Sequence, residues 1–245
     1  FLLNKIKNYL IVLKYNNKNI YFFGEIYYLK NSKSEKFSQS EGFKKRLKIA
    51  LLNKTLVNIP NLIEGNYYFI IQNKNGTIEI GRNETGEKEV FYFYNKKKIL
   101  ISDTLEPIIK NLDNFEISKY NNEAIFNMLT VYGNYSFKKD TLYKDISRLG
   151  VNEFIKIKNL KLEIISKQFK PLKIKNFKEK DLKRYYENLE ISVKLRSSSG
   201  INWIFMSSGW DSSGILSILN KLHGCKKIRA VIGRVKYSNK IGRAS

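Results

Sequence analysis

The stretch that decides the fold of the C-terminal part is Trp203-Ile204-Phe205-Met206-Ser207-Ser208-Gly209-Trp210-Asp211-Ser212-Ser213. Its first four residues form an unbroken apolar run, which is typical of a short strand buried on both faces of a parallel sheet. The Ser and Gly residues that follow predict a loop, and residues 213–222, closed by Gly224, predict a helix. A second run, Ile228 to Ile232, predicts a second buried strand. Because strand, helix and strand follow one another, parallel pairing is expected.

The loop between the predicted strand and helix has the composition of an anion-binding loop. Short side chains let the backbone approach a phosphate, and a helix N-terminus adds unpaired N–H groups and a positive dipole. The hydroxyls of Ser207, Ser212 and Ser213 can donate to phosphate oxygens. Asp211 would repel a polyphosphate unless it holds a Mg²⁺ ion that bridges to the phosphates. The alternative left open is that Asp211 caps the helix and the serines fill a turn.

Upstream of this stretch, residues 1–167 have the pattern of antiparallel hairpins mixed with helices. Short apolar runs separated by turn signals predict hairpin strands at 66–72, 77–82, 90–94, 99–102, 152–158 and 161–166. Apolar residues at helical spacing predict helices at 42–56, 103–111 and 122–132. We therefore expect an α+β domain at 1–167, a Lys-rich linker at 168–178 and an α/β segment at 179–245.

The segment after the linker begins with a predicted amphipathic helix at residues 179–194. The apolar side of this helix is formed by Leu182, Tyr185, Tyr186, Leu189 and Val193. Two helices and two buried strands cannot cover both faces of a parallel sheet, so we expect residues 179–245 to be poorly stable by themselves.

The charge of the chain is its most conspicuous bulk property. The 245 residues include 45 Lys and Arg against 22 Asp and Glu, a formal net charge of +23. Only eight of these cations are Arg, which nucleic-acid surfaces favour for bidentate contacts, so a nucleic-acid partner is not expected. The single Cys225 and single His223 exclude a disulfide framework and a multi-histidine zinc site, and disfavour a Ser-His-Asp hydrolase. No stretch reaches the ~18 apolar residues of a membrane helix, and we expect a cytoplasmic protein without a membrane partner.

Residues 206–213 resemble the S-G-G-x-D-S pyrophosphate loop of ATP pyrophosphatases, in the form used by the asparagine synthetase family. Ser207, Gly209, Asp211 and Ser212 match this motif, and Ser208 stands where the family has a glycine. The resemblance assigns a set of residues to ATP binding: Met206, Ser207, Ser208, Gly209, Asp211, Ser212, Ser213, Ile232 and Gly233. It implies that Met206 lies against the adenosine and that Asp211 is the Mg²⁺ ligand.

Upstream segments resemble the glutaminase domain of the same family, in the family's order. They are Gly24-Glu25-Ile26-Tyr27, residues 64–69, the set Arg82, Gly86, Lys88 and Tyr92, residues 101–103, residues 141–146, and Leu149-Gly150. The resemblance implies an antiparallel N-terminal-nucleophile-hydrolase-like sandwich, followed by the first part of a parallel-sheet PP-loop domain. Complete enzymes of this kind release ammonia from glutamine. They use ATP and Mg²⁺ to adenylate a carboxylate, typically aspartate, which ammonia converts to an amide.

The glutaminase pocket departs from the family at three points. The family's nucleophile is an N-terminal cysteine, whereas none of the 23 residues before Gly24 is a cysteine. Phe23 replaces an asparagine that donates to the oxyanion, and the loss of one such donor costs roughly 3 kcal/mol. Gln39 replaces an aspartate that holds the amino group of the substrate. Gly24 and Glu25 remain as remnants of the pocket, the catalytic residues stay unassigned, and we expect an inactive glutaminase half.

These observations predict an asparagine synthetase-like amide ligase, present as a fragment cut at both ends. Its partners would be a small-molecule carboxylate and either ammonia or an amine donor, and a homodimer is left open. One alternative is a diversified relative, similar to a β-lactam synthetase or a lasso-peptide cyclase. Another is a non-catalytic binding remnant. A nucleic-acid-binding pyrophosphatase relative, such as a tRNA modifier, would leave the upstream resemblances unexplained.

Overall fold

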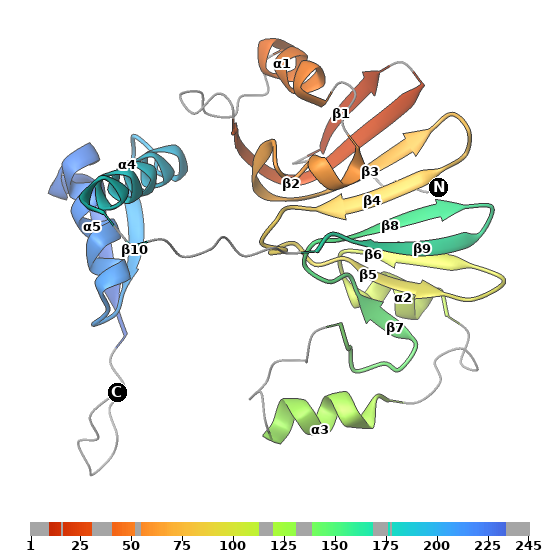
Figure 1. Cartoon of the computed structure of the whole chain (residues 1–245). Helices are drawn as coiled ribbons and strands as arrows, with labels where there is room; N and C mark the ends of the chain where they lie inside the picture. Colours follow the sequence, from red (N-terminus) through yellow and green to blue (C-terminus); the bar gives the residue numbers. More distant parts are fainter. Residues whose placement is uncertain are drawn as a thin grey trace. The chain divides into compact units, whose positions relative to one another are not determined.

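The computed structural model of the chain describes residues 10–15, 17–30, 41–51, 55–112, 120–130, 139–168, 176 and 178–233. Contacts between Cα atoms divide the chain into two compact units, Phe1–Leu172 and Lys173–Ser245 (Figure 1). The division falls within the predicted linker, of which residues 169–175 and 177 lie outside the described part. No helix of the described part is long and apolar enough to cross a membrane.

The first unit contains a six-stranded antiparallel sheet in the order β1-β2-β3-β4-β8-β9. Its strands are β1 (Leu10–Tyr15), β2 (Lys18–Leu29), β3 (Ile63–Asn73), β4 (Ile78–Arg82), β8 (Glu153–Lys158) and β9 (Lys161–Ser166). The β2–β3 register shifts once, between Ile26 and Tyr28. Buried apolar side chains alternate along the strands, so both faces of the sheet carry an apolar cluster.

A smaller antiparallel sheet covers one of these two faces. It has the order β6-β5-β7, with strands β5 (Phe91–Tyr94), β6 (Ile99–Ser102) and β7 (Ile146–Arg148). One apolar cluster joins the two sheets, and its members include Phe23, Ile70, Ile80 and Ile155 of the larger sheet with Tyr92 and Ile101 of the smaller one. The predicted antiparallel sandwich is therefore confirmed.

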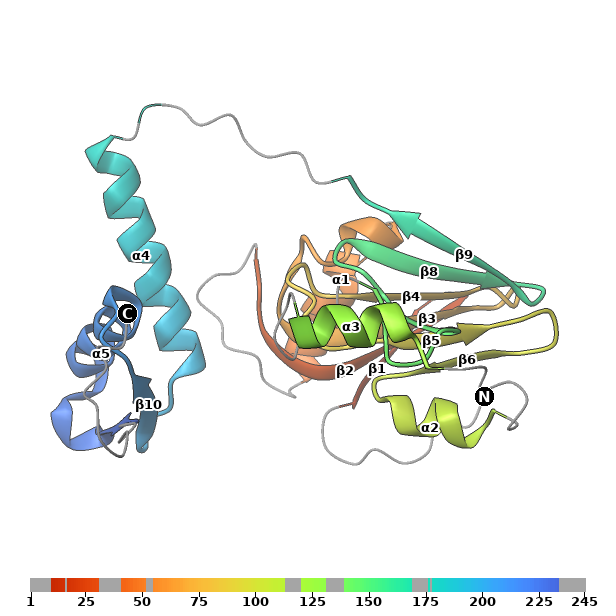
Figure 2. The same ribbon diagram turned by 90° about the horizontal axis from the view of Figure 1, so that it is seen from below.

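Helices cover the two outer faces of the sandwich (Figures 1 and 2). The helix α1 (Glu41–Leu51) and the 3₁₀ helix η1 (Leu56–Asn58) pack on the larger sheet through residues such as Phe43 and Leu56. The helix α2 (Leu105–Lys110) packs on the smaller sheet through Ile108. The helix α3 (Asn122–Thr130) buries only Ala124. The first unit is thus mixed α/β, with antiparallel sheets between helical layers.

The second unit is built around a parallel pair of strands. The strands β10 (Asn202–Met206) and β11 (Ile228–Ile232) are joined by α5 (Trp210–His223) and the 3₁₀ helix η2 (Cys225–Lys227), and α4 (Glu179–Arg196) precedes them. The predicted parallel pairing is confirmed. Val193 of α4, Ile204 of β10, and Ile218 and Leu219 of α5 form the buried cluster of this unit.

The predicted bounds of two helices differ from the structure by three residues or more. The helix predicted at 42–56 ends at Leu51, and Thr55 has an extended backbone with φ −77° and ψ 155°. The prediction ran on because Leu56 belongs to the same apolar cluster as Leu51, and burial alone does not distinguish one helix from two. In the second unit, α5 begins at Trp210 instead of residue 213, because Gly209 is the residue that caps it.

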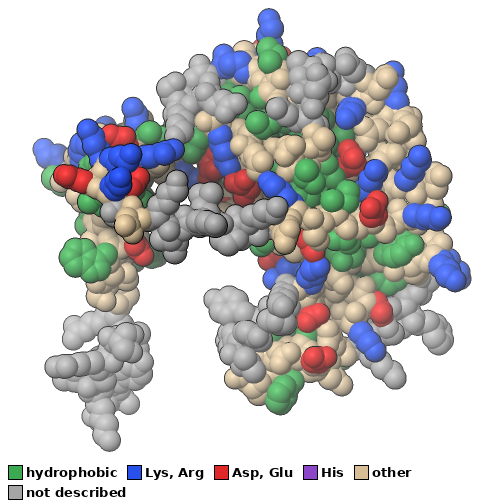
Figure 3. Space-filling view, in the orientation of Figure 1, with side chains coloured by type: hydrophobic (Ala, Val, Ile, Leu, Met, Phe, Trp, Pro, Cys, Tyr) green, Lys and Arg blue, Asp and Glu red, His purple; other side chains and the backbone are tan. Residues whose placement is uncertain are grey.

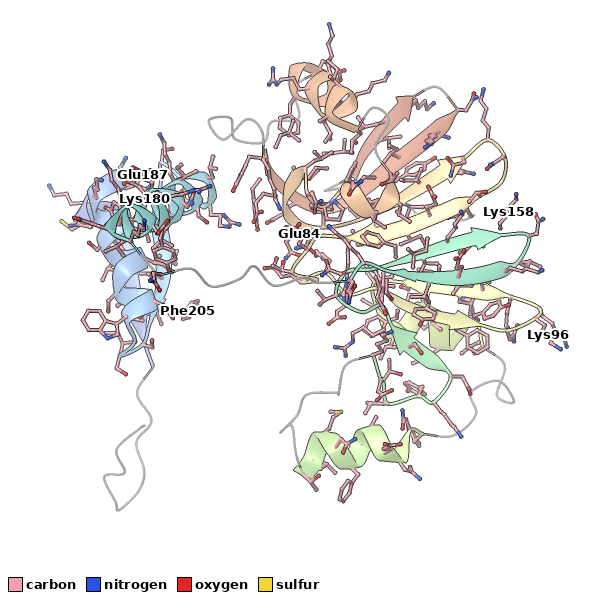
Figure 4. All side chains as sticks on the ribbon, in the orientation of Figure 1. Glu84, Lys96, Lys158, Lys180, Glu187 and Phe205 are labelled. Carbon is pink, nitrogen blue, oxygen red and sulfur yellow. The ribbon has the colours of Figure 1, made fainter. Side chains whose placement is uncertain are left out.

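Two predictions of strand burial are also wrong. The strand β11 is not buried, because Arg229 and Ala230 are exposed and Ile232 is 75% exposed. The strand β10 is not buried on both faces. Ile204 is buried against the helices, whereas Trp203 and Phe205 are 69% and 80% exposed (Figure 4). The helices α4 and α5 share one cluster with the Ile204 side of the strand, so they pack on the same face. No described residue buries the opposite face. The apolar run identified the strand correctly, but it could not say which faces this chain covers.

The apolar side of α4 is likewise buried at only one end. Val193 near its C-terminus is buried and Leu189 packs against the same cluster. Leu182, Tyr185 and Tyr186 near the N-terminus are 55%, 63% and 44% exposed. The predicted helix is therefore confirmed, whereas the prediction that its whole apolar side is buried is wrong.

Candidate functional site

The candidate loop connects β10 to α5 through Ser207, Ser208 and Gly209. Gly209 is the N-cap residue, with φ −83° and ψ 155°, and it has no side chain to make a capping hydrogen bond. Asp211 lies exposed in the first turn. Asp211 is therefore not the N-cap residue of α5, and it lies exposed beside the loop.

Serine hydroxyls close the loop on itself. The Ser212 hydroxyl lies 3.2 Å from the carbonyl oxygens of Ser207 and Gly209, and it accepts the Ser207 N–H over 3.2 Å. The Ser213 hydroxyl donates to the Gly209 carbonyl over 3.1 Å. These hydroxyls hold the shape of the loop. The N–H groups at the start of α5 have no acceptor within the helix, so they are the natural donors for an anion.

Ser208 enters this loop without requiring a left-handed backbone. Within the described part of the chain, the non-glycine residues with positive φ are Asn152, Asn159 and Leu160. Ser208 therefore occupies the glycine position of the resembled motif with an ordinary φ. Its neighbour Gly209 has less room, because a Cβ there would lie 3.2 Å from the Ser207 Oγ.

The remaining residues assigned to ATP lie at the same edge of the parallel pair. Met206 and Ile232 are directly opposite each other in the register of β10 and β11. Met206 is half-buried, Ile232 is 75% exposed, and Gly233 follows at the end of β11. The structure therefore brings Met206, the loop 207–213 and residues 232–233 together at the carboxyl ends of two parallel strands. Open α/β sheets bind ligands at this edge.

The donor set at this edge limits the kind of metal site it can form. The described residues contain no group of three or more His, Cys, Asp or Glu that could hold a metal ion. Mg²⁺ bound with a nucleotide needs only one or two protein carboxylates, because phosphates and waters complete its coordination. The exposed Asp211 beside the loop fits this second kind of site.

A separate groove of about 510 Å³ runs between α5 and β11. Its lining comes mainly from one side of the helix and from the strand: Ser213, Leu216, Ser217, Asn220, Cys225, Ile228 and Ala230. Asp211 is not among these residues. The groove is therefore distinct from the loop edge, which it meets only at Ser213.

In the first unit, the pocket remnants sit where β2 and β3 approach closely. Gly24 has φ +109°, and a Cβ there would lie 2.3 Å from the Asn66 carbonyl oxygen, so only glycine fits. Glu25 is exposed and accepts the Tyr27 hydroxyl over 3.3 Å. The Gln39 assignment lies outside the described residues.

Phe23 belongs to the interior of the sandwich. It is 7% exposed and stacks on Tyr68, with ring centroids 4.7 Å apart and an angle of 7° between the ring planes. Burial raises the pKa of the Tyr68 hydroxyl well above its ordinary value, and the Asp103 carboxylate adds to the effect. Position 23 thus holds an apolar core contact in place of a hydrogen-bond donor.

Two of the upstream resemblances meet in one buried contact that the sequence did not reveal. The Arg82 guanidinium donates to the carbonyl oxygens of Gly86 and Lys88, over 2.9 and 3.0 Å, and to that of Leu149. Arg82 is 5% exposed, and burial lowers its pKa while Glu89 opposes that shift. We call this contact the Arg82 clamp. The R-x-x-x-G-x-K spacing could have indicated a local clamp, but nothing in it points to Leu149.

The fold and the loop define the structural class of this protein. An antiparallel α/β sandwich is followed in the chain by a parallel strand–loop–helix–strand unit. No known family model and no curated protein matches the sequence. Solved structures that it resembles include glutamine phosphoribosylpyrophosphate amidotransferase from B. subtilis, complexed with ADP and GMP, at 10% identity and a TM-score of 0.38. Another is described as the allosteric regulatory enzyme of purine biosynthesis, at 10% identity and a TM-score of 0.37. The matches cover 95% and 96% of this chain but 50% of each of those chains, so this chain spans about half their length.

Proposed function

We propose that this chain belongs to an asparagine synthetase-like ligase, which forms an amide bond through an acyl-adenylate made from ATP. The observation that carries the proposal is the segment 207–213, a hydroxyl-rich loop with the first turn of the following helix, at the carboxyl edge of two parallel strands. It opens directly into α5 with the exposed Asp211 in the first turn. We take aspartate as the default carboxylate and ammonia or another amine as the nucleophile.

Each part of the loop has a role in this proposal. The N–H groups at the start of α5 bind phosphate oxygens, and Met206 and Ile232 form an apolar edge for the base and ribose. Asp211 would hold Mg²⁺, which would supply charge neutralisation for the pyrophosphate leaving group. The Ser212 and Ser213 hydroxyls keep the loop in shape through the carbonyls of Ser207 and Gly209. This arrangement favours preorganised binding of a polyanion over a reaction that needs a protein nucleophile.

We propose that the sandwich unit is a glutaminase-like domain without glutaminase activity. The buried stack of Phe23 on Tyr68 supports this, because an oxyanion needs a polar donor at that position. Glutamate release from glutamine at a rate above background would contradict it.

Nucleotide binding is tested with the chain itself, by intrinsic fluorescence. The chain has two tryptophans, and Trp210 is 94% exposed at the first residue of α5. In a Trp203→Phe background we expect ATP with Mg²⁺ to change Trp210 emission in a saturable way. Asp211→Asn should weaken binding of the Mg²⁺ complex about tenfold, since it removes the protein carboxylate from the metal. The matched control is Glu187→Gln on the exposed surface of α4 (Figure 4).

Equal effects of Asp211→Asn and Glu187→Gln, or no response to ATP, would refute the proposed role of the loop. The carboxylate is identified by ATP–pyrophosphate exchange, stimulated by aspartate or by members of a panel of other carboxylates. Exchange with another carboxylate and not with aspartate would favour a diversified relative, similar to a β-lactam synthetase or a lasso-peptide cyclase. Binding of ATP without any exchange would favour a non-catalytic binding protein.

A further inference from the structure

Four hairpin turns of the sandwich carry lysines and no acidic residue. The turns lie at residues 17–18, 74–77, 95–98 and 158–161. Their exposed lysines are Lys18, Lys74, Lys96, Lys97, Lys158 and Lys161. None of these six takes part in an ion pair within the described residues.

The topology gathers the four turns at one end of the sandwich. The Lys74 N–H donates to the Asn17 carbonyl over 2.8 Å, which joins the first two turns. Ile78 pairs with Ile157, which sets the second turn beside the β8–β9 turn. The β5–β6 turn lies at the same end in both views (Figures 1 and 2), and Figure 4 labels Lys96 and Lys158 there. We call this surface the lysine end.

The dimensions of the lysine end match a flat partner. Strands lie about 4.8 Å apart and packed sheets about 10 Å apart, so the turns of a six-stranded sheet extend over roughly 24 Å. Figure 3 shows Lys and Arg side chains along this edge of the first unit. The charge is spread over turns from two sheets and is not concentrated in a pocket.

An apolar side chain stands at the centre of the β8–β9 turn. Lys158 pairs with Lys161, and the two residues between them, Asn159 and Leu160, have φ of 50° and 56°. Such a turn favours Asn-Gly, and a left-handed backbone is unfavourable for leucine. Leu160 is also 57% exposed, so folding gains little from it. Tyr94, 43% exposed, stands beside the lysines of the β5–β6 turn.

We propose that the lysine end docks this protein on the surface of an anionic lipid bilayer. Lysines near such a surface are attracted by its negative potential without needing a fixed geometry. Leu160 at the apex enters the boundary between headgroups and acyl chains, where an aliphatic side chain gains from leaving water. A nucleic acid offers no comparable partner to Leu160, and its readers favour Arg and stacked aromatic side chains. This proposal revises the expectation of no membrane partner, and it is independent of the proposed ligase activity.

The test is co-sedimentation of the chain with lipid vesicles. We expect binding to vesicles of equal phosphatidylcholine and phosphatidylserine, and none to phosphatidylcholine alone. Each lysine contributes about a fivefold gain in partitioning, so Lys96→Gln, Lys97→Gln, Lys158→Gln and Lys161→Gln together should reduce binding at least a hundredfold. The matched control changes four exposed lysines of the second unit to Gln: Lys180, Lys183, Lys226 and Lys227. The control has the same net charge and should keep its binding.

Leu160→Asn separates lipid insertion from folding. Asparagine tolerates positive φ, so this variant should fold at least as stably as the parent while it binds vesicles about tenfold more weakly. Equal losses in the two lysine quadruple variants would overturn the proposal, because net charge alone would then explain binding. Absence of vesicle binding would also overturn it. Tight binding of single-stranded RNA would also overturn the proposal, if it needs the same lysines, is unchanged by Leu160→Asn and is not displaced by vesicles.

Discussion

Replacement of Arg82 by methionine should destabilise the sandwich unit more than any surface substitution. The change removes a buried cation and leaves the carbonyls of Gly86, Lys88 and Leu149 without their donor. Hydrogen bonds to charged groups contribute about 1.5–3 kcal/mol each, but neighbouring carbonyls can recover some water. We therefore expect a loss of about 3–5 kcal/mol, from three hydrogen bonds to a charged group partly offset by water at the freed carbonyls. That is a large part of the 5–15 kcal/mol typical of a domain.

The assay is urea unfolding followed by circular dichroism at neutral pH. With a slope of about 1–3 kcal/mol per molar urea, the midpoint should fall by roughly 2 M. Lys144→Met, an exposed change in the same unit, is the matched control and should stay within about 0.5 kcal/mol. Gly86→Ala should be costly, because Gly86 has φ +67° and its Cβ would lie 2.9 Å from the Arg82 Cζ. The steric part of that cost should shrink in the Arg82→Met background. A loss below about 1 kcal/mol for Arg82→Met would refute the clamp.

Two further perturbations follow from the same unit. Glu153 is 7% exposed, and burial alone would raise its pKa, yet its contacts with Lys139 and Ser166 hold the pKa below its ordinary value of 4.5. A depressed pKa adds stability above the unfolded-state value that is lost as the pH falls through the folded-state value. Glu153→Gln should therefore flatten the loss of stability on acidification below about pH 4.5, and parallel urea midpoints for the two proteins at neutral and acidic pH would contradict this. Gly24→Ala, with its Cβ 2.3 Å from the Asn66 carbonyl, should cost about 2 kcal/mol or more, and a thermal midpoint equal to that of the parent would refute the close approach of β2 and β3.

Local patterns were sufficient to predict most strands and the parallel pairing of the second unit. Alternating apolar residues indicate a strand, because the backbone geometry of a strand points successive side chains to opposite faces. An Asn-Gly pair between two such strands indicates the turn of a hairpin. Burial was harder to predict, because it depends on what packs against an element. Trp203 and Phe205 are large apolar residues of the kind found in protein cores, yet they are exposed in the described part of the chain. The start of α5 was missed for a related reason, since a glycine cap without a side-chain bond leaves little compositional signal.

The candidate site shows the same division between local and long-range information. The loop residues 207–213 are contiguous, so their juxtaposition follows from the sequence alone. The pairing of Met206 with Ile232 follows once parallel strands are assumed, because the carboxyl ends then share an edge. The contact of Arg82 with Leu149 spans two sequence motifs that no local rule connects. Similarly, the motif residue Thr141 is buried, and its hydroxyl donates to the Ile146 carbonyl over 2.7 Å, which closes a turn. Part of the resemblance in the first unit is therefore explained by the stability of turns, independently of catalysis.

The number of lysines in the sequence was not sufficient to predict the lysine end. Along the sequence they are scattered over turns between residues 17 and 161, and that spacing indicates only solvated loops. An antiparallel sheet returns the chain at alternate ends, so every second turn of a meander lies at the same end. The order β1-β2-β3-β4-β8-β9 then places three lysine-bearing turns along one edge, and the second sheet adds a fourth. A prediction of binding partners from net charge alone ignores where on the fold the lysines lie. The controlled comparison is therefore between two sets of four lysines of equal charge, one inside the lysine end and one outside it.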